Sequence, residues 1–157
     1  MKPVTADLQK RRKQLPHWQQ GGCTYFITFR SARGILPEIA LRQVIKNIEF
    51  DHRKKYELFF AVVMPDHVHL LLKPLQKSPN CCWDLSEILR GIKGTSARFI
   101  NKLLGTGGAV WQEESFDRII RDQKEFDEKL QYIWDNPVDA GLVEASEEYL
   151  YFVYQPD

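Results

Sequence analysis

The clearest indication of the fold of this chain comes from the stretch Ala61-Val-Val-Met-Pro-Asp-His-Val-His-Leu-Leu-Leu72. Its two apolar runs are separated by Pro65-Asp66, a tight turn signal, and predict two antiparallel strands joined by a short turn. His67 and His69 open the second run, and residues two apart point to the same face of a strand. The stretch therefore predicts a hairpin with two neighbouring imidazoles on one face and Val68 on the other.

Two imidazoles on one sheet surface supply half of a site for a divalent ion. An ion that holds phosphate keeps open positions for water and substrate, and one further oxygen ligand would suit Mg²⁺ or Mn²⁺. Alternatively, the two histidines are exposed polar residues without a specific role, or they form a hydrogen-bonded pair. Such roles are more frequent than metal binding for His-X-His in a strand. The spacing alone leaves both interpretations open.

The segments on either side of this hairpin complete an α+β pattern. Their order is strand, helix, strand, strand, helix, strand and a further helix, which predicts a ferredoxin-like antiparallel sheet with helices on one or both faces. Pro137 is expected to stop the last helix, and residues 75–83 are expected to form a loop. The apolar faces of the first two helices are expected to include Ile39, Phe99 and Leu103. We expect strands at 24–30, 56–64, 67–73 and 116–120 (with Trp111) and helices at 37–54, 84–104 and 122–136.

The length of 157 residues and the apolar fraction of 43% fit a single domain with one core. We interpret residues 1–157 as one domain, with a basic arm at 1–22 and a C-terminal tail at 144–157. No run of about 18 apolar residues occurs, so no membrane association is expected. Three cysteines without CxxC spacing argue against a disulfide framework and a cysteine zinc site, and favour a cytoplasmic location.

The net charge of +1 conceals a strong asymmetry along the chain. Residues 1–33 carry a net charge of +6, residues 34–111 carry +4 and residues 112–157 carry −9. The first two thirds are therefore suited to a polyanion, although solvated faces that differ by chance would give the same numbers.

The last predicted helix offers partners for the histidines. Phe126, Leu130 and Ile133 form its apolar stripe, and Tyr132 falls off that stripe, one helical turn before Asn136. The Asn136 carbonyl could bind the metal while Tyr132 attacks a phosphate, and the neighbouring Lys129 could favour the phenolate or bind a phosphate. A packing tyrosine and an asparagine that merely ends a helix remain the alternatives.

Several motifs together resemble the single-tyrosine HUH transposases, in which HUH denotes His, a hydrophobic residue and His. The resemblance is greater to the REP-associated tyrosine transposases, relatives of the IS200/IS605 enzymes, and covers roughly residues 10 to 145. Family members commonly have a tyrosine just after Trp-Gln, and residues 113–117 here contain none. The motifs that carry the resemblance are Leu15 to Arg30, Met64 to Leu72, Trp111-Gln112, Tyr132 to Val138 and Gly141 to Val143.

The resemblance implies a metal-dependent nickase and strand transferase that acts on single-stranded or hairpin DNA. It implies that Mg²⁺ or Mn²⁺ is bound by His67, His69 and Asn136, and that Tyr132 forms a 5′-phosphotyrosine link. It also implies a monomer or a homodimer. The runner-up is a domesticated DNA-binding protein without catalysis, and a third interpretation is a phosphodiesterase that uses water. Plausible phosphate or base contacts are Arg11, Arg12, Trp18, Arg30, Trp83, Lys93, Arg98, Lys102 and Lys129.

Overall fold

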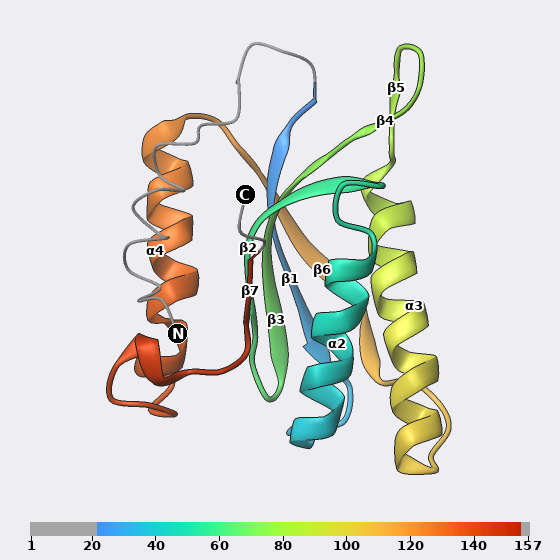
Figure 1. The fold of residues 1–157 in the computed structure, drawn as a ribbon, viewed down its shortest axis with the longest axis vertical. Coiled ribbons are helices and arrows are strands. Elements are labelled where there is room, and N and C mark those ends of the chain that lie inside the picture. Colours follow the sequence, from blue (N-terminus) through green and yellow to red (C-terminus); the bar gives the residue numbers. More distant parts are fainter. Residues whose placement is uncertain (1–21, 155–157) are drawn as a thin grey trace.

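The computed structural model describes residues 22–154 and contains a five-stranded antiparallel sheet with helices on both faces (Figure 1). The strands lie in the order β6-β1-β3-β2-β7, and the expected ferredoxin-like α+β fold is confirmed. The strands of this sheet are β1 (Thr24–Ser31), β2 (Tyr56–Val63), β3 (His67–Pro74), β6 (Trp111–Ile120) and β7 (Phe152–Val153). The helices are α2 (Glu38–Phe50), α3 (Leu85–Leu104) and α4 (Gln123–Asp139), followed by a 3₁₀ turn at Ser146–Glu148.

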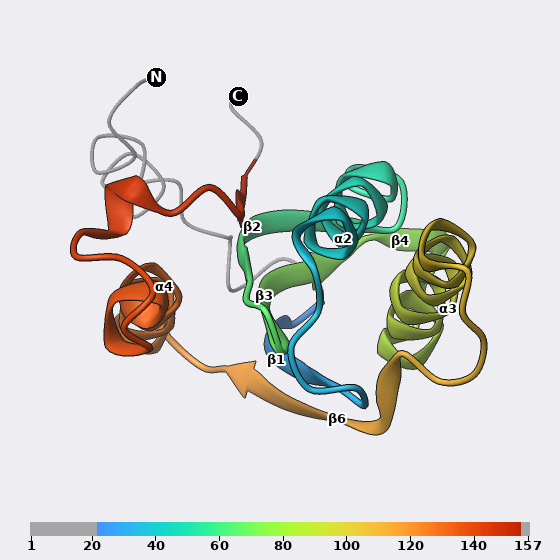
Figure 2. The same ribbon diagram turned by 90° about the horizontal axis from the view of Figure 1, so that it is seen from below.

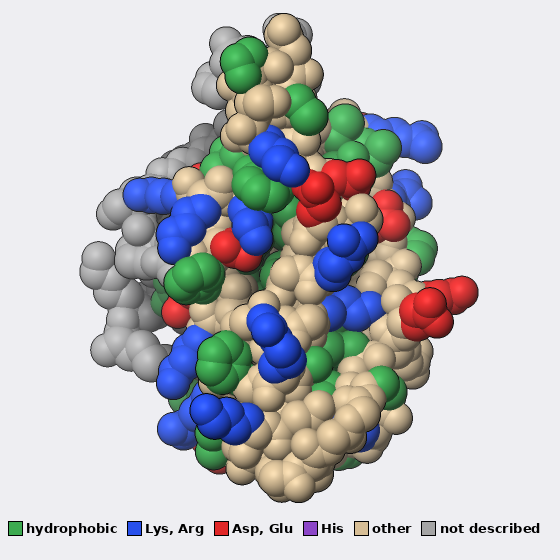
Figure 3. Space-filling view, turned by 90° about the vertical axis from the view of Figure 1, so that its right-hand side faces the viewer, with side chains coloured by type: hydrophobic (Ala, Val, Ile, Leu, Met, Phe, Trp, Pro, Cys, Tyr) green, Lys and Arg blue, Asp and Glu red, His purple; other side chains and the backbone are tan. Residues whose placement is uncertain are grey.

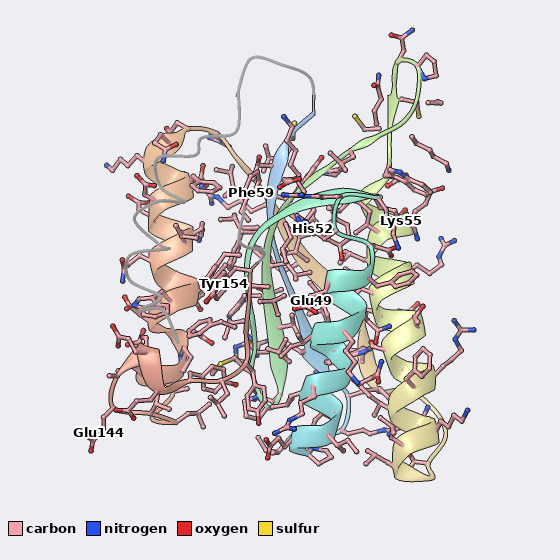
Figure 4. All side chains as sticks on the ribbon, viewed as in Figure 1. Glu49, His52, Lys55, Phe59, Glu144 and Tyr154 are labelled. Carbon is pink, nitrogen blue, oxygen red and sulfur yellow. The ribbon has the colours of Figure 1, made fainter. Side chains whose placement is uncertain are left out.

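The two faces of the sheet bury separate halves of the core. Figure 2 shows α2 and α3 on one face and α4 on the other. Because side chains alternate along a strand, Leu70 packs with the buried residues on the α2 and α3 face, and Leu71 packs with those on the α4 face. A bulge between Leu58 and Phe60 breaks this alternation in β2, so Phe59 and Phe60 both pack on the α4 side (Figure 4). The sheet is therefore covered by two helices on one face and by one on the other.

Two helix ends differ from the sequence prediction. The helix expected to reach residue 54 ends at Phe50, because Arg53 adopts a left-handed φ of 65° that a helix cannot continue through. The helix expected to stop before Pro137 continues to Asp139. A proline this near the end removes only one intrahelical hydrogen bond, and Pro137 is buried.

The buried stripe of α3 also differs from the prediction. Phe99 and Leu103 were expected to face the core and are 46% and 48% exposed. The buried positions follow a strict spacing of four residues, which drifts by about 40° per step around a helix and leaves Phe99 and Leu103 outside the contact. Ile39 of α2, also expected inside, is 48% exposed. The buried positions of α3 are Ile88, Ile92, Ser96 and Ile100.

Short strands occur in segments that were not expected to form strands. Residues expected to form a loop contain a small hairpin, with β4 at Gln76–Ser78 and β5 at Cys81–Cys82. Within the expected C-terminal tail, β7 pairs with β2 at the edge of the sheet, and the Tyr149 hydroxyl donates to the Val63 carbonyl at 2.6 Å. In the part of the chain that the structure describes, no helix is long and apolar enough to cross a membrane.

Candidate active site

His67 and His69 lie side by side at the beginning of β3, on the face that α4 covers. Their ring centroids are 4.7 Å apart, whereas Val68 between them is fully buried on the opposite face. Strand β1 runs antiparallel to β3, with Arg30 opposite His67 and Thr28 opposite His69. The alternation expected from the sequence thus places both imidazoles among polar residues of the neighbouring strand.

Each imidazole is held through its Nδ1 atom by a different oxygen. His67 Nδ1 lies 2.6 Å from Oδ1 of Asp66, and His69 Nδ1 lies 2.7 Å from Oγ1 of Thr28. An oxygen acceptor at Nδ1 favours the tautomer that carries its proton there, which leaves a lone pair on Nε2. The ionised Asp66 carboxylate can only accept and therefore favours a lone pair on Nε2 of His67, whereas the Thr28 hydroxyl, which can donate or accept, fixes the orientation of the His69 ring.

Asn136 reaches this pair from α4. Its Oδ1 atom lies 3.2 Å from Nε2 of His67, although the two residues are 69 positions apart in the sequence. Phe126, Leu130 and Ile133 of α4 are fully buried and hold the helix against the sheet. This packing positions Asn136 next to the start of β3. The structure thus brings together the three side chains that the resemblance implies as ligands.

The environment of His69 keeps its ring neutral. Its side chain is buried, and burial together with the nearby His67, Arg30 and Lys129 lowers the pKa of His69 from 6.5 to about 3. Its Nε2 atom is buried and has no hydrogen-bond partner among the described residues. A neutral imidazole with an unused buried nitrogen is what a metal ligand requires, because a buried polar atom without a partner is otherwise costly.

The donor atoms fit a divalent ion of the magnesium or manganese type. Two imidazole nitrogens and one amide oxygen form a mixed set that Mn²⁺ accepts readily and that leaves positions for water and phosphate. Within residues 22–154, no group of three or more His, Cys, Asp and Glu side chains is arranged to hold a metal. Together with the two imidazoles, the amide oxygen of Asn136 would make a set of three ligand atoms.

Tyr132 lies beside the histidines on the same helix as Asn136. Its ring centroid is 5.2 Å from that of His69 and 5.9 Å from that of Phe26, and its side chain is 46% exposed. The Lys129 ammonium lies 4.8 Å from the centre of the Phe26 ring and 5.8 Å from the centre of the Tyr132 ring. The phenol is therefore accessible, next to the imidazoles and near a cation.

A cleft of about 650 Å³ opens at this point over β1 and β6. It contains His69, Tyr132 and two cationic side chains, Arg30 and Lys129, that suit a phosphate backbone. Sequence reasoning missed Thr28 and Phe116, because only strand pairing shows that they flank the histidines. The other residues that line the cleft are Phe26, Thr28, Phe29, Gln112, Glu114, Ser115 and Phe116.

The candidate DNA contacts lie on two sides of the molecule. Arg30 and Lys129 line the cleft, whereas Lys93, Arg98 and Lys102 belong to α3 on the other face of the sheet. Figure 3 shows Lys and Arg side chains gathered on the side that carries α3. Lys93 is engaged within the protein, because its ammonium donates to the Gln112 and Glu113 carbonyls at 2.7 and 3.1 Å.

Of the remaining predicted contacts, only Trp83 belongs to the described residues, and it does not line the cleft. Arg11, Arg12 and Trp18 lie outside the described residues. Trp83 packs with the group of buried residues on the α2 and α3 face, with the Lys77 ammonium 4.6 Å from the centre of its ring. His52 lies past the C-terminal end of α2 (Figure 4), and its Nδ1 accepts from the Leu58 backbone N–H at 3.0 Å.

The fold and the paired histidines are those of a transposase of the HUH type. Residues 33–136 match the family model described as "Transposase IS200 like", so the chain belongs to the IS200-like transposase family. The predicted resemblance to REP-associated tyrosine transposases is also confirmed. A Haemophilus influenzae protein provisionally named as such a transposase is 26% identical over 107 residues, which span 65% of this chain and 61% of that protein.

Two solved structures resemble this one. A REP-associated tyrosine transposase bound to a REP hairpin aligns with a TM-score of 0.65 and 23% identity, over 88% of this chain and 82% of the other. A provisionally named transposase from Deinococcus radiodurans aligns with a TM-score of 0.48 and 22% identity, over 76% of this chain and 94% of the other. The first similarity supports the fold assignment.

Proposed function

We propose that this protein cleaves and rejoins single-stranded DNA at hairpin-forming sequences through a covalent bond to Tyr132. The observation that carries the proposal is the convergence of Tyr132, His69 and Asn136 at one end of α4. The Tyr132 and His69 rings are 5.2 Å apart, and the Asn136 carbonyl oxygen is 3.2 Å from Nε2 of His67. The proposed nucleophile and His69 line one accessible cleft, and His67 and Asn136 lie next to it.

The chemistry follows from these side chains. His67, His69 and Asn136 would hold Mg²⁺ or Mn²⁺, which supplies polarisation of the scissile phosphate when bound. The Tyr132 oxygen attacks phosphorus, its proton leaves to water, the bond from phosphorus to the 3′ oxygen breaks, and the departing 3′ oxygen takes a proton from water. The products are a 5′-phosphotyrosine and a free 3′-OH. Because the phosphodiester energy is conserved in the new bond, a second 3′-OH can reverse the reaction on another strand without ATP.

Two facts support DNA as the substrate. The cleft carries Arg30 and Lys129, which suit a polyanion entering beside the tyrosine. The structure with a TM-score of 0.65 to this chain belongs to a REP-associated tyrosine transposase bound to a REP hairpin. We therefore propose a hairpin with a single-stranded extension as the substrate class.

A covalent trapping experiment tests the nucleophile. The wild-type protein is incubated with hairpin-bearing single-stranded DNA and Mn²⁺, and denatured mass spectrometry is expected to find a DNA adduct on Tyr132. EDTA and the Tyr132→Phe substitution should each abolish the adduct. Tyr25→Phe, on the opposite face of the sheet, is the matched control and should leave it unchanged.

The other interpretations give different results in the same experiment. An adduct that persists in Tyr132→Phe would contradict the assignment of the nucleophile. Hairpin binding without nicking at any metal concentration would favour a DNA-binding protein without catalysis. Cleavage with multiple turnovers and no adduct would indicate a phosphodiesterase that uses water.

A further inference from the structure

Phe116 is an exposed apolar side chain with charged residues on either side of it. It lies on β6, the edge strand, and 58% of its surface is exposed inside the cleft that holds His69 and Tyr132. The residues two positions away on either side of it, Glu114 and Arg118, are charged and exposed. An isolated exposed phenyl ring between charges does not form the continuous apolar patch that a protein partner would cover.

Strand pairing places this ring in line with the candidate active site. Phe116 of β6 is opposite Thr28 of β1, and Thr28 is opposite His69 of β3. Neighbouring strands lie about 4.8 Å apart, so the Cα of Phe116 is roughly 10 Å from that of His69 on the same sheet face. A DNA strand whose phosphate lies at the histidines and extends across β1 therefore passes over Phe116.

The charges along this path match the chemistry of a nucleotide. Arg30 of β1 and Lys129 of α4 line the same cleft and suit the phosphates. The Phe116 ring offers an apolar flat surface, and every nucleobase has a π-face that stacks on an aromatic side chain. The cleft thus combines cations for the backbone with an exposed phenyl ring, that of Phe116, for a base.

We infer that Phe116 is a stacking platform for one unpaired base of the DNA strand whose phosphate lies beside Tyr132. This inference rests on the proposed function and adds to it a residue that holds the strand by a base and not by a phosphate. Because stacking tolerates any base, Phe116 sets the position of the strand in the cleft and leaves its sequence to other contacts.

A binding experiment without chemistry tests the platform. Affinities are measured in the Tyr132→Phe background for one hairpin-bearing oligonucleotide, selected from a randomised library and carrying a single-stranded extension. Phe116→Ala is expected to weaken binding by about 5- to 150-fold, the range for loss of one stacked base. Phe116→Tyr and Phe116→Trp, which keep an aromatic ring, should restore most of the affinity.

Ile119→Ala is the matched control. Ile119 lies on the same strand, is 49% exposed and pairs with Tyr25, whose side chain packs on the opposite face of the sheet. Its replacement removes a similar exposed apolar group away from the cleft, and we expect unchanged DNA affinity. Loss of affinity in both variants to the same degree would overturn the inference, since it would indicate damage to β6 as a whole.

Abasic substitutions locate the stacked base. A series of oligonucleotides, each with one abasic nucleotide in the extension, is titrated against the proteins with and without Phe116→Ala. At one position the two proteins should bind equally, because the base and the ring that stack on each other are then both dispensable. A constant ratio between the two proteins at every position would overturn the inference, and so would equal affinity for the intact DNA.

The two proposals fail in distinguishable ways. If wild-type protein forms the Tyr132 adduct while Phe116→Ala binds normally, the platform is wrong and the proposed function stands. If the abasic series shows one dependent position while no adduct forms in Mn²⁺, the platform stands and the nuclease assignment fails. If no oligonucleotide binds, both are wrong.

Discussion

Asp66 and Thr28 are the two residues that orient the histidines. Each places an oxygen within 2.7 Å of an Nδ1 atom, and the two oxygens differ in charge, since Asp66 offers a carboxylate and Thr28 a hydroxyl. A carboxylate partner raises the basicity of an imidazole more than a hydroxyl does. Asp66 is therefore expected to have a larger effect than Thr28 on the affinity for a divalent ion.

Replacing Asp66 should weaken metal binding. Asp66→Ala removes the carboxylate that fixes the His67 tautomer, and changes at such positions typically cost about 10- to 100-fold in metal affinity. Isothermal titration of the purified protein with Mn²⁺ measures the change. Asp117→Ala, an exposed aspartate of β6 outside the metal-ligand cluster, is the control and should bind Mn²⁺ as the wild type does. Unchanged Mn²⁺ affinity in Asp66→Ala would contradict the proposed role.

At the level of elements, Arg33, two residues past the end of β1, forms several hydrogen bonds to the end of α3 and to the loop that follows it. The Arg33 guanidinium donates to two side-chain oxygens and three carbonyls, with donor–acceptor distances of 2.7 to 3.2 Å. These bonds hold the connection that leads from α3 into β6, the strand that carries Phe116. The acceptors are Asn101 Oδ1, Thr106 Oγ1 and the carbonyls of Gly107, Gly108 and Ala109.

Removing this arginine should destabilise the fold. Arg33→Ala leaves several loop acceptors without their donor, and we expect a loss of about 1–3 kcal/mol in the free energy of unfolding. Urea denaturation followed by circular dichroism measures it. Arg42→Ala serves as the control, because Arg42 is exposed and interacts only at the surface, with Glu38 and Tyr151, and such exposed interactions contribute little. An equal effect of the two substitutions would show that the loop bonds do not stabilise the domain.

The stability of the fold should fall in alkaline solution. Burial raises the pKa of Tyr56 and of Tyr149 above the usual value of 10.0, because a buried phenolate is poorly solvated. In the unfolded chain both phenols lose their protons near pH 10, while the folded chain keeps them. The unfolded state then binds fewer protons, so the free energy of unfolding decreases as pH rises, by about 1.4 kcal/mol per pH unit for each tyrosine.

Tyr149→Phe separates this effect from general alkaline damage. The variant loses the hydrogen bond to the Val63 carbonyl and should be less stable at neutral pH. Its stability should nevertheless fall less steeply than that of the wild type above pH 10, because one titrating phenol is gone. Denaturant titrations at a series of pH values give both slopes, and identical slopes would contradict the prediction.

At the scale of the whole molecule, metal binding should couple to folding. His67 comes from the start of β3 and Asn136 from the end of α4, so the ligand set exists only when these elements are docked. A ligand that binds the native state alone raises its stability. We therefore expect Mn²⁺ to raise the Tm of the protein in differential scanning calorimetry, and EDTA to reverse the shift.

Asn136→Ala identifies the contribution of the docked helix. The variant keeps both histidines but loses the oxygen ligand, so its Tm should respond less to Mn²⁺ than that of the wild type. Asn47→Ala, on α2 and on the other face of the sheet, should respond fully. A full Mn²⁺ response in Asn136→Ala would show that this residue does not bind the ion.

Much of this architecture was predictable because it depends on local patterns. Alternation along β3 places Val68 and the two histidines on opposite faces, and the spacing of Phe126, Leu130 and Ile133 places Tyr132 off the buried stripe of α4. The ends of α2 and α4 were not predictable, because Arg53 in a left-handed turn and a proline tolerated in a last turn depend on the surrounding packing. The exposure of Phe99 depends on the angle at which α3 crosses its neighbours.

The element order, the face on which each imidazole lies and the family to which the chain is similar all follow from the sequence alone, since periodicity and motifs are properties of neighbouring residues. Which distant residues share a site depends on the tertiary structure. It placed Asn136 next to His67, Thr28 next to His69 and Phe116 in line with both, while it assigned Arg98 to the other face. The physical reason is that strand register and helix docking result from burial of the whole core, and no short segment of sequence contains that information.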